Sequence, residues 1–363
     1  MHVKKTRIIK SLAFSVVLAL AAGACGGDDE TTSSGGSGGT DKTPLSATLK
    51  GSGATFPKAF YEVAIASYGE EQPGVTIEYA GGGSGTGRQQ LQDQLVDFAG
   101  SDGLVKAEDV PKYKGGEFLY VPTVAAPITV SYNLSDVKDL VLDADTIAKI
   151  FQRQITKWDD DAIKALNSGV SLPSTDIVVA HRSDGSGTTE NFTKYLVAAA
   201  PTTWTLKSGS TVEWPADTQA GNGNAGVAAI VKDSVGAIGY VDLSDAKATG
   251  LQFATIKNRA GKAVKPTLEG ASAALAGATI NPDLSYNPLN ADGDGAYPIT
   301  APTWILVYKN QTDKAKGDAI KSFLTYILTD GQDLANPVDY AELPDALKTK
   351  ALAQLDNIVV PVA

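Results

Sequence analysis

Three glycine-rich segments hold most of the side chains that could bind a ligand in this sequence. They are GSGATFPKAF at residues 51–60, AGGGSGTGRQQL at 80–91 and HRSDGSGTTENF at 181–192. Each places Gly together with Ser or Thr in front of a stretch with helical spacing. A helix N-terminus presents free backbone N–H groups and the positive end of the dipole, and Gly lets a ligand approach closely. The shared chemistry is the binding of an anion.

Each of these segments needs a strand before it and a helix after it to position its polar groups. In the first, Gly53 precedes Thr55, and Pro57 falls where a helix begins, a position that Pro favours. In the second, apolar residues alternate over 75–79 as in a strand, and Ser84 lies near the start of a polar helix. The pattern predicts a strand, a glycine loop and a helix each time.

The third segment follows the same design. An apolar strand at 177–180 precedes the loop, and Phe192, Tyr195, Leu196 and Ala199 follow at helical spacing. Taken singly, each loop is also explained by ordinary caps and turns, but three together favour a binding site. None of the three has the spacing of a nucleotide P-loop, a dinucleotide G-x-G-x-x-G loop or a hydrolase G-x-S-x-G elbow.

Composition excludes several classes of function. The chain has 363 residues, 31 Lys and Arg against 41 Asp and Glu, a net charge of −10 and 43% hydrophobic residues. It is long enough for two domains and apolar enough to fold. The acidic balance argues against nucleic-acid binding, which needs clustered cations. With His181 as the one histidine outside the leader and Cys25 as the one cysteine, His and Cys metal sites are not expected.

The first 25 residues read as an export signal. Four cations precede an apolar run at 12–22, which is too short to span a bilayer, and Ala22-Gly23-Ala24 leads to Cys25. This resembles the lipobox of bacterial lipoproteins, in which Cys25 carries the lipid, although Ala22 stands where that motif usually has Leu. The alternative is a signal-peptidase site with a free Cys. Residues 26–45, rich in Gly, Ser and Thr, are expected to form a flexible tether.

From about residue 46 to the C-terminus, the chain resembles a known family. The motifs GSGATFP, YAGGGSGTG with VDFAGSD, RSDGSGTT, KWDDDAI, STVEWP, GAIGYV and YPIT, in this order, are similar to those of the phosphate-binding lipoproteins of bacterial phosphate-specific ABC transporters. The resemblance implies a two-lobed α/β periplasmic-binding-protein fold of type II, each lobe a mixed sheet flanked by helices, with the ligand in the cleft. Lobe I would comprise 46–124 and 299–363, and lobe II 125–298.

The resemblance also implies the ligand set. Asp184 would pair with the binding Arg, and His181 stands where the family often has a second basic residue, so we expect it to lie outside the ligand contacts. No catalytic residue, metal or cofactor is implied. The residues carried over as phosphate ligands are Thr55, Phe56, Ser84, Asp102, Arg182, Ser186, Gly187 and Thr188.

The implied function is an extracytoplasmic receptor that captures inorganic phosphate and delivers it to the permease subunits of an ABC importer. Asp102 would accept a hydrogen bond from a P–OH group, which sulfate lacks. We expect a non-catalytic monomer, lipid-anchored through Cys25 to the outer face of the cytoplasmic membrane. The alternatives are an enzyme acting on phosphate esters and a surface interaction protein without a ligand.

Overall fold

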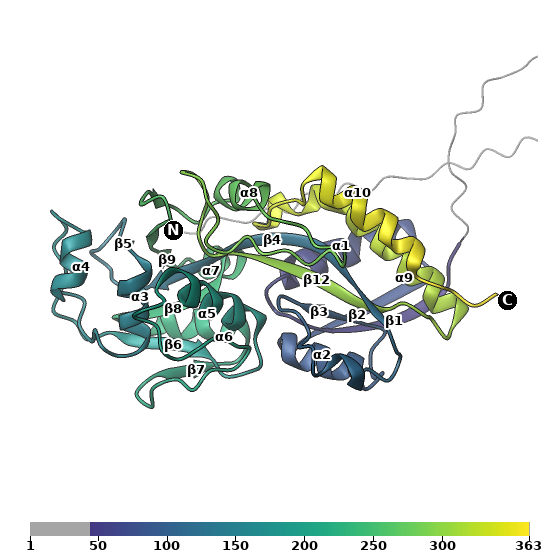
Figure 1. Ribbon diagram of the computed structural model, residues 1–363, viewed down its shortest axis with the longest axis horizontal. Coiled ribbons are helices and arrows are strands. Elements are labelled where there is room, and N and C mark those ends of the chain that lie inside the picture. Colours follow the sequence, from purple (N-terminus) through teal and green to yellow (C-terminus); the bar gives the residue numbers. More distant parts are fainter. Residues whose placement is uncertain (1–43, 363) are drawn as a thin grey trace, which may run out of the picture. The chain divides into compact units, whose positions relative to one another are not determined.

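Strands and helices alternate through residues 44–362, which the computed structural model describes (Figure 1). The expected leader at 1–25, its Cys25 and nearly all of the expected tether lie outside the described residues. Leu45, at the end of that tether, already belongs to the folded domain. Its backbone N–H donates to Gln72 Oε1 at 3.3 Å, and its side chain packs against the core, which favours burial of this apolar group.

The strands form one large and one small sheet. Their bounds are β1 (Ala47–Gly53), β2 (Val75–Gly81), β3 (Phe98–Ser101), β4 (Phe118–Tyr132), β5 (Val141–Leu142), β6 (Val178–Arg182), β7 (Gln219–Gly221), β8 (Ala237–Asp242), β9 (Gln252–Phe253), β10 (Thr255–Lys257), β11 (Ala263–Val264) and β12 (Thr300–Tyr308).

The large sheet has the order β2-β1-β3-β12-β4-β8-β6-β7, with β9 also paired to β4. β1 is parallel to β2 and β3, and β6 is parallel to β7 and β8, whereas β4 and β12 run antiparallel to all their neighbours. The small sheet has the order β11-β10-β5. The sheets are therefore mixed, as expected from the sequence.

The α-helices cover these sheets. Side-chain caps begin several of them, for example Asp143, Ser186 and Asp313, because a short polar side chain can accept a bond from a free N–H of the first turn. Their bounds are α1 (Lys58–Glu71), α2 (Ser84–Gln92), α3 (Ala144–Phe151), α4 (Asp161–Leu166), α5 (Gly187–Ala199), α6 (Gly223–Asp233), α7 (Leu243–Thr249), α8 (Leu268–Ala276), α9 (Lys314–Leu328) and α10 (Asp345–Gln354).

Short 3-10 turns occur at Val110–Lys112, Asp330–Leu334, Asn336–Val338 and Leu355–Asn357.

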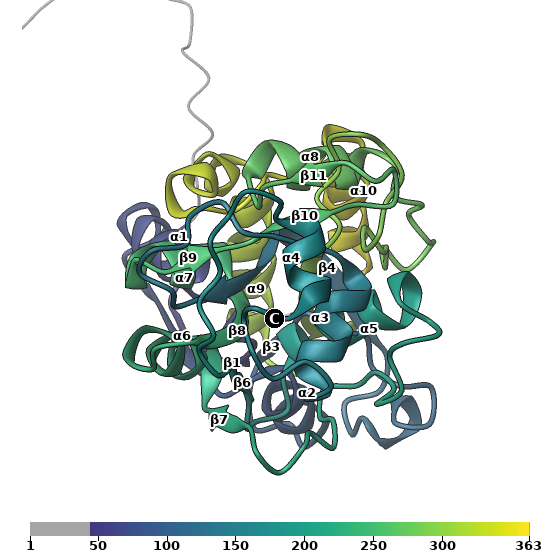
Figure 2. The same cartoon turned by 90° about the vertical axis from the view of Figure 1, so that its left-hand side faces the viewer.

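The elements form two groups that share the long strand β4 (Figure 1). The first group consists of β1, β2, β3, α1, α2, α9 and α10, and the second of β5 to β8 and α3 to α7. β4 pairs with β12 over 118–127 and with β8 over 128–132, so it belongs to both. In Figure 2 the second group faces the viewer. β10, β11 and α8 lie at the top of this view, and β6 and β7 lie at the bottom. A single strand thus pairs with strands of both groups within the large sheet.

The pairing of β4 and β12 is irregular at one point. Thr303 lies opposite Val124, but the next residue, Trp304, lies opposite Pro122, so Thr123 is an extra residue of β4. Such a bulge bends the strand and increases its twist. The carbonyl of Thr123 accepts from Gln332 Nε2 at 2.9 Å. The bulge lies inside the β4–β12 pairing, five residues before Ile128, the first residue of β4 that pairs with β8.

The three predicted junctions are present. β1 leads to α1, β2 leads to α2 and β6 leads to α5, each through its glycine-rich loop. The core that supports them is rich in aromatic side chains, with Trp158, Phe192 and Tyr240 fully buried. Between residues 44 and 362, no helix is both long and apolar enough to cross a membrane.

Candidate anion-binding site

Arg182 ends strand β6 and is held on several sides. Its side chain is 1% exposed. Its Nε donates to Asp184 Oδ1 at 2.8 Å, and its Nη2 donates to the other oxygen of the same carboxylate. Nη1 donates to Asn224 Oδ1 at 2.8 Å and lies 3.4 Å from Thr188 Oγ1. These contacts fix the plane of the guanidinium, which suits it to bind two oxygens of one anion.

Asp184 stays ionised beside this cation. Partial burial alone would raise the pKa of Asp184, but the hydrogen bonds and the charge of Arg182 outweigh burial and hold the pKa below its ordinary value. The backbone N–H of Gly223 also donates to Asp184 Oδ1, at 3.0 Å. The carboxylate therefore orients Arg182.

The N-terminus of α5 supplies donors next to Arg182. Ser186 caps the helix by accepting from the N–H of Thr189 at 3.0 Å, so its hydroxyl hydrogen is still available. Among the described residues, no acceptor contacts the backbone N–H of Gly187 or Thr188, and both residues are buried. Buried N–H groups without a partner are costly, which favours an anion here.

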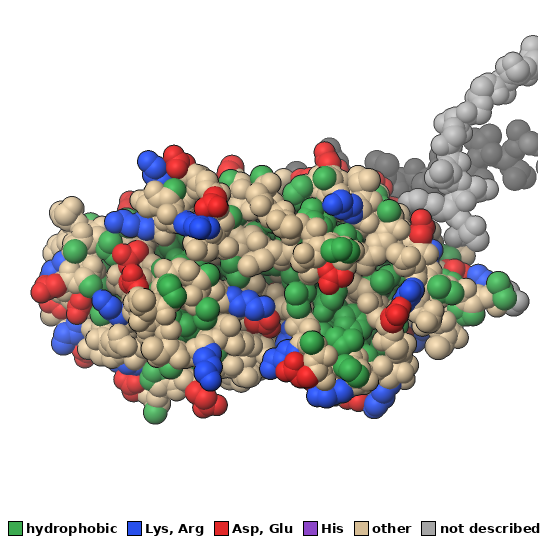
Figure 3. Space-filling model, in the orientation of Figure 1, with side chains coloured by type: hydrophobic (Ala, Val, Ile, Leu, Met, Phe, Trp, Pro, Cys, Tyr) green, Lys and Arg blue, Asp and Glu red, His purple; other side chains and the backbone are tan. Residues whose placement is uncertain are grey.

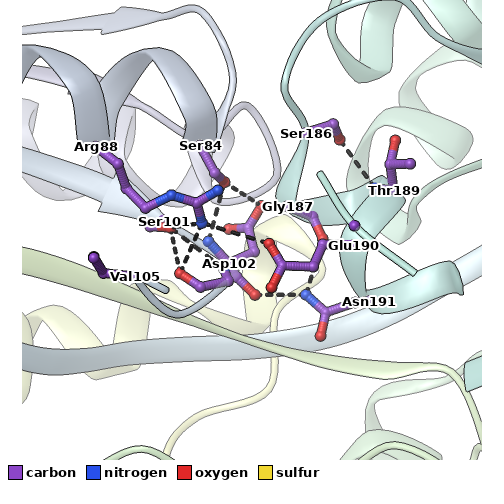
Figure 4. A network of polar contacts seen from close by, with 12 residues as sticks. Ser84, Arg88, Ser101, Asp102, Val105, Ser186, Gly187, Thr189, Glu190 and Asn191 are labelled. Carbon is purple, nitrogen blue, oxygen red and sulfur yellow. Dashed lines mark hydrogen bonds and ion pairs between the residues drawn. The ribbon is translucent and has the colours of Figure 1, made fainter. Parts of the chain in front are cut away.

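Gly187 has no room for a side chain. A Cβ at this position would lie 2.6 Å from Asp102 Cβ and would also meet Ser84 Oγ. The start of α5 in the second group thus packs directly against Asp102 and Ser84 of the first group. Figure 4 shows this approach, with Gly187 beside Ser84 and Asp102.

Asp102 follows β3 and is buried, with 2% of its surface exposed. Its Oδ1 accepts from the hydroxyl of Thr303 at 2.7 Å, and its Oδ2 lies 3.3 Å from Ser84 Oγ. Burial raises the pKa of Asp102 to about 7, although the bond from Thr303 and the charge of Arg182 both lower it. Asp102 is therefore a hydrogen-bonding carboxyl whose proton can exchange near neutral pH.

Two further helix starts contribute donors from the first group. Thr55 and Phe56 precede α1, and Ser84 is the first residue of α2. Within the described part of the chain, the backbone N–H groups of these three residues have no acceptor. The Phe56 ring lies in the core against Tyr340, whose hydroxyl donates to the Phe56 carbonyl at 2.6 Å. Phe56 can thus offer a ligand only its backbone.

Contacts across the two groups bring the predicted residues together. Thr55 Oγ1 accepts from the N–H of Asn224 at 3.3 Å, Gly85 N–H donates to the Gly185 carbonyl at 2.8 Å, and Asn191 Nδ2 donates to the Asp102 carbonyl at 2.5 Å. All eight predicted ligands and Asp184 lie in this one network of loops. One guanidinium, several neutral donors and one carboxyl can bind a small anion that carries a proton.

His181 lies beside this network without entering it. Its ring stacks on Trp214, Nδ1 lies 2.9 Å from the Arg182 carbonyl and Nε2 lies 3.0 Å from Thr218 Oγ1. A carbonyl only accepts, so in the neutral ring Nδ1 carries the hydrogen. Burial lowers the pKa of His181, which keeps the ring neutral near pH 7.

The sequence predictions missed three side-chain contacts of this site. Thr303 bonds Asp102, Asn224 bonds Arg182, and Arg88 of α2 lies 3.5 Å from Glu190 of α5 (Figure 4). Asn224 had a detectable signal, because GNGNAG at 221–226 is a fourth strand-loop-helix junction and has the G-x-G-x-x-G spacing. Thr303 and Arg88 had none, since their partners are distant in the sequence.

A cavity of about 340 Å³ adjoins this site. Thr55 and Asn224 line it together with Lys58, Glu62 and Asp245. Among residues 44–362, no group of His, Cys, Asp or Glu side chains is arranged to hold a metal ion. The chemistry of the site therefore rests on hydrogen bonds and one guanidinium.

Comparison with known proteins places this fold in a class. A family model described as a PBP superfamily domain matches residues 38–331. Two solved structures are similar in fold. A periplasmic phosphate-binding protein solved with phosphate bound has a TM-score of 0.72 and 23% identity, covering 85% of this chain and 94% of that one. A phosphate-binding protein of Stenotrophomonas maltophilia has a TM-score of 0.68 and 20% identity, covering 85% and 94%.

Relatives in sequence narrow the class further. The phosphate-binding protein PstS of Methanocaldococcus jannaschii is 38% identical over 349 residues, which cover 90% of this chain and 88% of the relative. The protein of the same name from Pasteurella multocida is 36% identical over 318 residues, which cover 86% and 91%. The chain belongs to the PstS family of phosphate-binding proteins.

Proposed function

We propose that this protein is a receptor that captures inorganic phosphate and delivers it to the permease subunits of an ABC importer. The observation that carries the proposal is the position of Asp102, a buried carboxyl in one network with Arg182 and unpaired helix N–H groups. The relatives from M. jannaschii and P. multocida are named phosphate-binding proteins, and the solved neighbour with TM-score 0.72 holds phosphate.

The carboxyl of Asp102 makes the site selective for a protonated anion. Near neutral pH, phosphate carries P–OH groups that can donate to a carboxylate, and sulfate carries none. When Asp102 is ionised, sulfate would place an unprotonated oxygen against a buried carboxylate, leaving two like charges without a shared hydrogen. Sites that demand a hydrogen bond can reject an analogue that lacks it by about 10⁴ to 10⁵. Arg182 and the N–H groups attract the anion, and Asp102 selects it.

Binding rather than catalysis is the proposed activity. Hydrolysis of a phosphate ester would need an activated nucleophile or a metal. His181, the one histidine among the described residues, is occupied by the Arg182 carbonyl and Thr218. A surface protein without a ligand would have no use for the unpaired buried donors at the starts of α1, α2 and α5.

We propose that the two groups of elements are moving lobes. Lobe I would comprise 46–124 with 299–363, and lobe II 125–298. The proposed ligands are divided between them, with Thr55, Phe56, Ser84 and Asp102 on one side and the Arg182 loop on the other. A ligand that contacts both sides favours their approach.

We propose that the protein is exported and held by a lipid on Cys25 at the outer face of the cytoplasmic membrane, as a monomer. The basic and apolar leader and the Gly/Ser/Thr-rich tether support this location. Replacing Cys25 with Ser is expected to shift the protein from the membrane pellet to the soluble fraction of cells. Unchanged membrane association of that variant would contradict lipid anchoring.

Isothermal titration tests the binding function. Protein freed of phosphate by partial unfolding and dialysis is titrated with phosphate and then with sulfate. Tight 1:1 binding of phosphate and no heat with sulfate is the expected result. Equal binding of both anions would contradict selection by Asp102, and binding of neither would contradict the receptor function.

A further inference from the structure

A fourth glycine loop faces the same network as the three predicted ones. β7 ends at Gly221, and α6 begins at Gly223, whose N–H donates to Asp184 Oδ1 at 3.0 Å. The third glycine of the loop, Gly226, packs against Gly221, where a Cβ would lie only 2.5 Å from the carbonyl carbon of Gly226. The loop therefore sets the start of α6 against Asp184.

Asn224, the second residue of α6, lies between the two groups of elements. It is fully buried, with 0% of its surface exposed. Its backbone N–H donates to Thr55 Oγ1 at 3.3 Å, which leaves the Thr55 hydroxyl hydrogen free to donate elsewhere. Its side-chain Oδ1 accepts from Arg182 Nη1 at 2.8 Å. Asn224 thus contacts proposed ligand residues from both sides of the site.

The amide nitrogen of Asn224 has no partner among residues 44–362. Nδ2 is buried and contacts no acceptor of the described chain. The orientation of the amide is fixed, because exchanging its oxygen and nitrogen would place NH₂ against the guanidinium, donor against donor. Nδ2 shares a carbon with the oxygen that Arg182 bonds, so the free donor lies beside the cation of the site. A buried donor left unpaired is costly.

We propose that Asn224 is a ligand-binding residue of this site, whose Oδ1 orients Arg182 and whose Nδ2 donates to an oxygen of the bound phosphate. This assignment rests on the proposed phosphate-binding function. The assignment accounts for both polar atoms of the Asn224 side chain. Oδ1 accepts a hydrogen bond from Arg182, and Nδ2 requires an acceptor that residues 44–362 do not supply. An anion oxygen is the acceptor that Arg182 and the helix starts would bring there.

Three variants test the roles of Oδ1 and Nδ2 of Asn224. Asn224→Ala removes the acceptor for Arg182 and the free donor, whereas Asn224→Asp keeps the acceptor and replaces the donor with a carboxylate oxygen. Asn222→Ala is the matched control, since Asn222 lies two residues earlier, is exposed and makes no side-chain capping bond. Each variant is titrated with inorganic phosphate after its melting temperature has been compared with wild type in the absence of phosphate.

Binding is expected to weaken by about 10- to 100-fold in Asn224→Ala, the usual effect of losing a bond to a charged group. It should weaken at least as much in Asn224→Asp and stay within about twofold in Asn222→Ala. Phosphate binding by Asn224→Asp that is tighter than by Asn224→Ala would overturn direct donation. So would wild-type affinity in Asn224→Ala. If wild type itself bound no phosphate, the receptor function would fail instead.

A second measurement does not depend on the variants folding. In ¹⁵N-labelled wild-type protein, the side-chain NH₂ signals of Asn224 and Asn222 are followed during titration with inorganic phosphate. The Asn224 pair is expected to shift and to exchange more slowly with solvent, while the Asn222 pair stays in place. An Asn224 pair unchanged at saturation would show that Nδ2 does not contact the anion.

Discussion

Asp102 is an unusual carboxyl because it is buried beside a guanidinium and still has a pKa raised to about 7. Desolvation outweighs the bonds from Thr303 and Ser84 and the charge of Arg182. A proton is therefore shared easily between this carboxyl and a ligand near neutral pH. That property suits the recognition of an anion by its P–OH group.

Replacing Asp102 with Asn is expected to reduce selection against sulfate. The amide removes the buried negative charge that repels sulfate and also removes one acceptor for P–OH. The ratio of phosphate to sulfate affinity should fall by at least about tenfold. Competition titrations measure the ratio, with Asp233→Asn at the exposed end of α6 as the control. An unchanged ratio would exclude Asp102 as the selecting group.

The raised pKa of Asp102 also predicts a pH dependence of stability in phosphate-free protein. Between about pH 4 and pH 7, the folded chain holds a proton that the unfolded chain has lost. The free energy of unfolding should then fall as pH rises, by about 1.4 kcal/mol per pH unit from this group. Below about pH 4 and above about pH 7, Asp102 does not make the free energy of unfolding depend on pH.

Urea unfolding of wild type and Asp102→Asn across this pH range measures that contribution. The raised pKa values of Asp242 and Asp245 affect both proteins alike, so the difference between the curves isolates Asp102. Parallel curves would mean that Asp102 is ionised throughout the range.

Residue roles were predictable from the sequence where a local motif encodes them. VDFAGSD and RSDGSGTT pointed to Asp102, Arg182 and Asp184, which the structure places in one network. Thr303 could not be predicted as a partner of Asp102, because 201 residues separate them and only the pairing of β12 with β3 and β4 brings them together.

At the scale of elements, the site is built by helix starts that meet across two groups. α1 and α2 approach from one side, and α5 and α6 approach from the other. The sequence predicted three of these starts because strand, glycine loop and helix follow one another locally. β7, which precedes α6, has only three residues, which is too short for a clear alternation of apolar side chains.

The close approach of α5 to Asp102 predicts the effect of a side chain at Gly187. In Gly187→Ala, the new methyl group would meet Ser84 Oγ and Asp102 Cβ, so α5 must move away from the first group. Phosphate affinity should fall by more than about tenfold, since the donors at the start of α5 would be displaced. The melting temperature without phosphate should change little, because the substitution adds one methyl group at a contact between loops and removes no side chain from the hydrophobic core.

Calorimetry of Gly187→Ala and of Gly277→Ala, which has open space at its Cβ position, tests this expectation. Wild-type affinity in Gly187→Ala would mean that the two groups need not approach closely to hold the ligand.

At the scale of the whole molecule, a protein with net charge −10 is expected to bind an anion through a buried site. Figure 3 shows acidic and basic side chains interspersed over the face in view. The alternation of strand and helix patterns predicted the α/β class, and the resemblance to phosphate-binding lipoproteins implied its two lobes. The pairing of β4 with strands of both groups was not predicted, because strand pairing depends on contacts far apart in the chain.

Because the proposed phosphate site is buried, its affinity for phosphate is expected to depend only weakly on salt. Exposed charges are screened over about 8–10 Å at physiological ionic strength, whereas Arg182, with 1% of its side chain exposed, is shielded from salt. Raising NaCl from about 50 to about 500 mM should change phosphate affinity by less than about threefold. Titrations at several concentrations of NaCl, with NaClO₄ as a second salt, measure this. A loss of tenfold or more would indicate attraction by exposed cations instead.

The extra residue Thr123 also sets the parity of strand β4. Successive side chains of a strand point to opposite faces of the sheet. One extra residue therefore moves every side chain on one side of it to the other face, relative to the partner strand. In a chain without Thr123, β4 would pair with β12 without interruption. Relative to 124–132, the side chains of residues 118–122 would then point to the opposite faces of the sheet from those that they occupy now. The irregularity that looks like a defect in the pairing thus decides which side chains of residues 118–122 face each side of the sheet, while β12 remains the partner of β4 before and after it.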